Sequence, residues 1–105
     1  MKEIPTWGER SKFNYSGSVT EGTKIVFKNA IVLKFSKEEY EKLLSFFSGK
    51  NVNVGTSRTD PPEGSLGKWI ELNMRKMGTT SFIGAIMLSE GYAIKTKNRA
   101  EIKFI

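Results

Sequence analysis

The chain has 105 residues, a formal net charge of +6, and neither cysteine nor histidine. A domain of this length can bury one core without the help of disulfides or metals. The missing residue types exclude disulfide frameworks, thiol nucleophiles, Cys/His zinc sites and the usual general base near neutral pH. We therefore expect a protein that is not an enzyme and that uses no metal and no cofactor.

The positive charge is concentrated towards the two ends of the chain. Residues 1–35 carry six Lys/Arg against three Glu, residues 36–63 carry four against five acids, and residues 64–105 carry seven against three. This distribution favours a polyanionic partner such as nucleic acid, although lysine-rich surfaces are also ordinary solubilising faces.

No apolar run approaches the roughly 20 residues that span a bilayer, and residues 1–12 lack the apolar region of a signal peptide. We expect a cytoplasmic protein without a membrane partner, and no small-molecule substrate is evident.

Residues 1–22 place Trp7, Phe13 and Tyr15 among cations and small polar residues. Aromatics mixed with cations can form a stacking surface for single-stranded nucleic acid. No alternation continues long enough to define such a platform, so we favour an N-terminal arm whose aromatics pack on the domain.

The stretch from Thr23 to Phe35 is rich in β-forming residues. The apolar residues that share one parity are Ile25, Phe27, Ile31, Leu33 and Phe35. It is longer than an ordinary strand, and Asn29 tolerates turn geometry, so two strands joined at Lys28 and Asn29 are predicted. The free edge of this extension can pair with a second copy, which makes a homodimer one expectation.

The clearest local signal is Ser36 with Glu39, the two residues of a capping box, flanked by Phe35 and Tyr40 as a hydrophobic staple. A helix is therefore predicted to begin directly after Ser36 and to end at Gly49. The side chains expected on its buried stripe are Tyr40, Leu43, Leu44 and Phe47.

Residues 51–56 alternate in polarity and predict a short strand that pairs with a C-terminal hairpin, and residues 57–65 are expected to form a loop. This loop contains Asp60 and Glu63, separated by two prolines. Because no histidine or third acid lies nearby, we favour an Asx turn and a helix-dipole partner over metal binding or catalysis.

Ser65 is a suitable N-cap for a helix that begins at about Leu66. The residues predicted on its buried face are Leu66, Trp69, Ile70 and Met77, with Trp69 buried between helices. A second helix, capped by Thr79, Thr80 or Ser81, ends at Gly91. Its buried stripe is predicted to be Phe82, Ile83, Ile86 and Met87.

Alternating residues after Gly91 predict a two-stranded hairpin whose basic tip is residues 97–100. One alternative remains open: because residues 82–88 form a short apolar run, they can also be read as a strand of a small barrel.

The order of helix, turn, helix and basic hairpin over residues 65–105 resembles the second half of the winged helix-turn-helix superfamily. The resemblance implies an α+β fold with three helices and a small antiparallel sheet, preceded by an N-terminal β-strand or hairpin extension. The implied organisation is an N-terminal arm at residues 1–22 and a single winged-helix-like domain at residues 23–105.

The general binding mode of the superfamily implies a regulator of transcription or replication that binds double-stranded DNA. The second helix would lie in the major groove and the hairpin along phosphates. The helix face expected to be exposed consists of Thr80, Ser81, Gly84, Ala85 and Leu88. These residues lack the side chains that usually read bases. Binding is therefore expected to be driven by contacts with phosphates. The expected DNA-binding residues are Arg75, Lys76, Thr79, Thr80, Ser81, Gly84, Ala85, Lys95, Lys97 and Arg99.

Two other functions remain open at this stage. The first is a winged-helix module, such as an inhibitor or adaptor, in which the small-residue face at Gly84 and Ala85 packs against a protein partner. The second is binding of single-stranded nucleic acid or RNA through the N-terminal aromatics and the hairpin.

Overall fold

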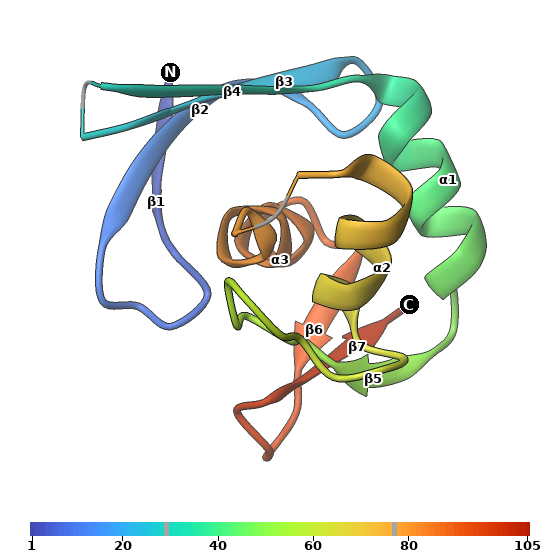
Figure 1. The fold of residues 1–105 in the computed structure, drawn as a ribbon. Helices are drawn as coiled ribbons and strands as arrows, with labels where there is room; N and C mark the ends of the chain where they lie inside the picture. The colour runs from blue at the N-terminus through green and yellow to red at the C-terminus, as the bar shows by residue number, and fades with distance from the viewer. Residues whose placement is uncertain (29, 77) are drawn as a thin grey trace.

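The computed structural model describes residues 1–28, 30–76 and 78–105, which form an α+β fold with three helices and two antiparallel sheets. The first sheet is a meander of four consecutive strands, β1 (Lys2–Pro5), β2 (Lys12–Ser18), β3 (Gly22–Phe27) and β4 (Ile31–Phe35). The elements that follow are α1 (Lys37–Phe47), β5 (Asn51–Asn53), α2 (Leu66–Met74), α3 (Thr80–Ser89), β6 (Ala93–Lys95) and β7 (Glu101–Phe104). Figure 1 shows the first sheet curving around α3, with α1 and α2 beside it.

The first sheet is larger than the sequence indicated. Residues 23–35 form two strands as predicted, and Lys28 after β3 has a positive φ of 54°. The other predicted turn residue, Asn29, lies outside the described residues. The segment predicted as an arm supplies β1 and β2, and β2 pairs with β3 through Tyr15 and Ile25. Half of the sheet therefore comes from residues 1–22.

The second sheet has the strand order β5-β7-β6. Val52 of β5 lies opposite Ile102 of β7, and Ile94 of β6 lies opposite Lys103. The predictions of a short strand after α1 and of a C-terminal hairpin are both confirmed. Lys97 and Arg99 at the hairpin tip are exposed.

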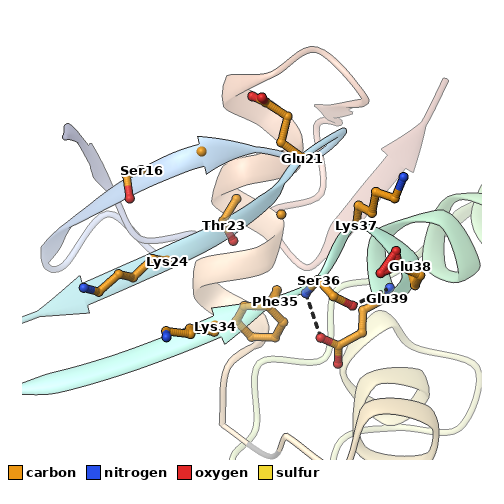
Figure 2. A pocket seen from close by; sticks show the side chains of 12 residues that line it. Ser16, Glu21, Thr23, Lys24, Lys34, Phe35, Ser36, Lys37, Glu38 and Glu39 are labelled. Carbon is orange, nitrogen blue, oxygen red and sulfur yellow. Dashed lines mark hydrogen bonds between the residues drawn. The ribbon is translucent and has the colours of Figure 1, made fainter.

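The start of α1 is the predicted capping box. The Glu39 backbone N–H donates to the Ser36 hydroxyl at 3.1 Å, and the Ser36 backbone N–H donates to the Glu39 carboxylate at 2.9 Å (Figure 2). Phe35 and Tyr40 lie with ring centroids 6.1 Å apart, as a staple requires. Both the first residue of the helix and its buried stripe follow the prediction, with Leu44 only partly buried.

The N-cap of α2 is Ser65, whose hydroxyl accepts from the Lys68 backbone N–H at 3.0 Å. The prediction of which residues form the inner face of α2 is only partly correct. Leu66 and Ile70 are buried, whereas Trp69 is half-buried and lies against the rings of Phe46 and Phe47 at the outer edge of α1. The expectation that Trp69 lies buried between helices is wrong because this edge of α1 is open to solvent. Met77, predicted on the same face, lies outside the described residues.

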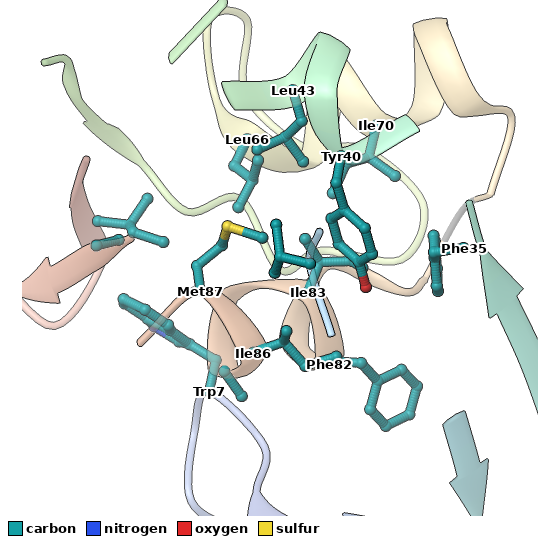
Figure 3. Packing of buried hydrophobic residues seen from close by; sticks show 14 of the residues in the cluster. Trp7, Phe35, Tyr40, Leu43, Leu66, Ile70, Phe82, Ile83, Ile86 and Met87 are labelled. Atoms are coloured by element: carbon teal, nitrogen blue, oxygen red, sulfur yellow. The ribbon is translucent and has the colours of Figure 1, made fainter. Parts of the chain in front are cut away.

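Helix α3 is at the centre of the core. The helical conformation of Thr80–Ser89 excludes the strand alternative for this run. The predicted stripe of Phe82, Ile83, Ile86 and Met87 is buried (Figure 3). The opposite face is buried too, since Thr80 and Ala85 are each 5% exposed and Gly84 is also buried. The expectation of an exposed face is therefore wrong for these three residues, whereas Ser81 and Leu88 of the predicted face are partly exposed. Residues 79–89 carry no charge, as expected for a helix that is mostly buried.

None of the helices in the described residues is both long enough and apolar enough to cross a membrane.

Candidate functional site

The N-terminal sheet covers the face of α3 that was expected to meet DNA or a partner. The Trp7 backbone N–H donates to the Ser81 carbonyl at 3.0 Å. The Trp7 ring lies so close to Gly84 that a Cβ there would be 3.0 Å from ring carbon Cε3. At the other end of α3, the Val19 N–H and the Tyr15 hydroxyl each donate to the Glu90 carboxylate at 2.9 Å.

These contacts correct several predicted roles. In this structure Thr79, Thr80, Gly84 and Ala85 are buried, so they do not form the exposed face that was predicted. The aromatics of residues 1–22 are buried, as the favoured interpretation required, with Trp7, Phe13 and Tyr15 at most 5% exposed. They offer no stacking surface for bases.

Lys76, expected to grip the DNA backbone, has partners within the chain. Its ammonium group donates to both Glu39 carboxylate oxygens at 2.9 and 3.0 Å and to the Lys34 carbonyl at 2.7 Å. Burial acts to raise the pKa of the Glu39 carboxyl, but hydrogen bonds from Ser36 and Lys76 and the Lys76 charge outweigh it, so the pKa lies below its ordinary value. Lys76 thus joins the segment after α2 to α1 and β4.

Lys95 also contacts the chain itself, although it was expected on a solvated ribbon. Its ammonium group lies 3.2 Å from the Trp7 carbonyl and 3.5 Å from the Glu9 carboxylate, and 5.0 Å from the centroid of the Trp7 ring. Lys95 is nevertheless exposed, as are the predicted cations Lys97, Arg99 and Arg75. Arg75 lies at the C-cap of α2 with a left-handed φ of 56°.

Three arginines line one cavity of about 530 Å³, which we call the arginine pocket. They are Arg10, Arg58 and Arg99, three of the four arginines in the chain. All three are exposed and therefore open to a ligand. The other residues that line the pocket are Thr6, Trp7, Gly8, Ser11, Phe27, Thr56, Ser81 and Phe82.

Three separate loops bring these arginines together around the start of α3. Arg10 lies in the β1–β2 turn, which the Thr6 N–H closes by donating to the Ser11 carbonyl at 2.9 Å. Arg99 lies at the tip of the β6–β7 hairpin, and its carbonyl accepts from the Trp7 indole N–H at 3.1 Å. The aliphatic part of Arg58 lies 3.6–4.0 Å from where a Cβ on Gly78 would stand, just before α3.

The electrostatics of the arginine pocket are one-sided. No carboxylate is among the lining residues within the described chain, and none of the three arginines forms an ion pair there. The pocket also lies at the N-terminal end of α3, where the helix dipole favours an anion. The hydroxyl of the N-cap Thr79 does not neutralise this end, because it donates to the Lys76 carbonyl.

A second concave surface is lined by side chains of both charges. The cavity beside the start of α1 is lined by Glu21, Glu38 and Glu39 together with Lys24, Lys34 and Lys37 (Figure 2). Its charges compensate one another, so it has no preference for an anion. The arginine pocket is the stronger candidate for a binding site.

Of the predicted DNA-binding residues, Ser81 and Arg99 line the arginine pocket, whereas Arg75 and Lys76 are not among its lining residues. Sequence reasoning missed Arg10 and Arg58. The chain has few arginines and many lysines. Because arginine binds phosphate bidentately, the few arginines could have been identified from the sequence as candidate phosphate-binding residues. No cluster of three potential metal ligands occurs among residues 1–28, 30–76 and 78–105.

A further hollow lies between α1 and α2, lined by Phe46 and Trp69 together with the polar residues Glu38, Glu41, Lys42, Ser45 and Asn73. Phe46 is 48% exposed and Leu72 is 66% exposed, and the half-buried Trp69 lies 5.9 Å from Phe46 between ring centroids. Apolar side chains gathered in this way are typical of a protein-contact surface.

Comparison of the chain with protein-family models, with curated proteins and with solved structures gives no match.

Proposed function

We propose that the protein binds DNA through its phosphate groups, with the arginine pocket as the main contact. The observation that carries the proposal is the convergence of three of the four arginines, from three separate loops, on one cavity without a carboxylate. The planar guanidinium fork matches phosphate oxygens in a bidentate geometry. The N-terminal end of α3 and the net charge of +6 add to the attraction.

The arrangement of the C-terminal elements supports a winged-helix interpretation. Three helices in the order α1, α2, α3 and a sheet in the order β5-β7-β6 accompany a hairpin whose exposed tip carries Lys97 and Arg99. In winged domains such a hairpin lies along the DNA backbone.

One step departs from the ordinary winged-helix mode. Because α3 is buried under the first sheet, it does not enter the major groove in this proposal. Affinity comes from arginine–phosphate contacts, so binding depends steeply on salt and little on base sequence.

The test is a set of alanine variants titrated with fluorescent duplex DNA at several salt concentrations. Arg10→Ala, Arg58→Ala and Arg99→Ala should each weaken binding about equally for all sequences. Each should lower the slope of log K against log salt by about 0.9 per contact removed. The matched control is Lys42→Ala, which removes an exposed cation from the outer face of α1.

The variants fold if their melting temperatures stay near that of the wild type, as expected for exposed side chains. Equal losses in the arginine variants and in Lys42→Ala would show that only net charge matters. Absence of wild-type binding at low salt would end the proposal.

A further inference from the structure

We propose that the arginine pocket holds a phosphomonoester, the terminal phosphate at the end of a nucleic-acid strand. This inference rests on the proposed function and specifies which phosphate the pocket selects.

The first argument is charge. Three arginines line the pocket, and no carboxylate lines it within the described residues. A phosphodiester inside a strand carries one negative charge, whereas a phosphomonoester carries about 1.5 to 2 at neutral pH. The monoester also has a third unesterified oxygen, so it can accept hydrogen bonds from more than one arginine at once. A terminal phosphate therefore neutralises the pocket more fully than an internal one.

The second argument is shape. The cavity of about 530 Å³ has walls from the β1–β2 turn, the loop after β5, the start of α3 and the β6–β7 hairpin. The volume lies within the roughly 300–1,000 Å³ of ordinary ligand sites, which leaves room for the attached nucleoside.

The third argument is the apolar part of the lining. Phe27 and Phe82 lie beside the arginines, with ring centroids 5.2 Å apart. Phe27 is only partly buried, and the Lys28 ammonium group lies 5.2 Å from the centroid of its ring. Ser81 provides a hydroxyl from the first turn of α3. The pocket thus combines a cationic part for the phosphate with an apolar wall for the first nucleoside.

The experiment compares matched oligonucleotides that differ only at one end. Single strands and blunt duplexes carrying a 5′-phosphate, a 3′-phosphate or only hydroxyl ends are titrated by fluorescence anisotropy. We expect at least one terminal phosphate to strengthen binding about tenfold or more, the effect of an added charge-assisted hydrogen bond. This preference should disappear in Arg58→Ala, weaken in Arg58→Lys, which keeps the charge without the fork, and persist in Lys42→Ala.

Each other outcome has a defined meaning. Equal binding of phosphorylated and hydroxyl-ended strands overturns this inference and leaves the proposed function intact, while binding of neither overturns both. Inorganic phosphate and a nucleoside monophosphate serve as competitors. If the monophosphate binds as tightly as the phosphorylated strand, the ligand is a free nucleotide and the assignment to a strand end is wrong. A preference that survives in Arg58→Ala places the phosphate outside the pocket and also overturns the inference.

Discussion

Trp7 joins the core to the candidate site. Its indole ring covers Gly84 of α3, and the same residue lines the arginine pocket. Two hydrogen bonds fix its position, from the backbone N–H to the Ser81 carbonyl and from the indole N–H to the Arg99 carbonyl. The ring is therefore unable to move away from α3 without pulling on the hairpin tip that carries Arg99.

A prediction at this scale concerns Gly84→Ala. Alanine is favoured over glycine inside a helix by roughly 0.8–1.0 kcal/mol, but the new methyl would meet the Trp7 ring at 3.0 Å. Overpacking a fixed neighbour costs about 1–3 kcal/mol, so we expect a net loss of stability of about 1 kcal/mol. Denaturant unfolding measures it, and a variant more stable than the wild type would show that Trp7 can shift.

Gly8→Ala is the matched control for this substitution. Gly8 lies in the β1–β2 turn, and a Cβ there has no heavy atom within 4 Å among the described residues. Its stability should stay near that of the wild type, within about 0.5 kcal/mol.

Among the elements, α1 shows how local signals predict structure. Ser36, Glu39 and the two staple aromatics lie within six consecutive residues, and their interactions depend on short-range geometry alone. The sequence therefore determined where this helix begins. It did not reveal that Glu39 also binds Lys76, a residue 37 positions away.

The Glu39→Gln variant separates the two roles of this residue. Glutamine can still accept the bond from the Ser36 N–H, because either residue serves in a capping box, but it loses the charge that pairs with Lys76. We expect a loss of about 0.5–1 kcal/mol near neutral pH, the range of a partly exposed ion pair.

The contribution of the Glu39 carboxylate to stability should depend on pH. Because the folded-state pKa of Glu39 lies below the ordinary value of 4.5, its ionised form stabilises the protein above that value. The stabilisation disappears as the pH falls through the folded-state pKa, so the wild type and Glu39→Gln should converge in acid. Unfolding followed across this range, with Glu38→Gln as control, measures the effect; a constant difference would contradict the ion-pair explanation.

At the scale of the whole molecule, the sequence predicted the elements but not how the N-terminal sheet meets them. Strand and helix positions follow from periodicity and caps, which act over a few residues. The contact of Trp7 with Gly84 joins residues that no local rule connects. The uncharged run at residues 79–89 could have indicated a helix buried on all sides, but not the element that covers it.

The candidate site depends on the same long-range packing. Arg10, Arg58 and Arg99 meet only because the β1–β2 turn, the loop after β5 and the hairpin surround one end of α3. Each arginine lies in a loop, where the sequence carries no periodic signal. Composition indicated a polyanionic partner, whereas the place of contact required the three-dimensional structure.

Hydrogen exchange tests whether the first sheet ever separates from α3. Helix α3 lies between the first sheet and the α2 side of the core, and hydrogen bonds at Ser81 and Glu90 join its two ends to residues 7–19. Its amides should therefore exchange only when the whole molecule unfolds. The amides of β1, a four-residue edge strand, should exchange through smaller openings. Exchange measured by mass spectrometry at increasing denaturant should therefore give α3 the global free energy of unfolding and β1 a lower value. If α3 instead exchanged together with β1 and β2 through one partial opening, the sheet would lift from the helix as a unit, and the face containing Gly84 and Ala85 would become available to a DNA groove after all.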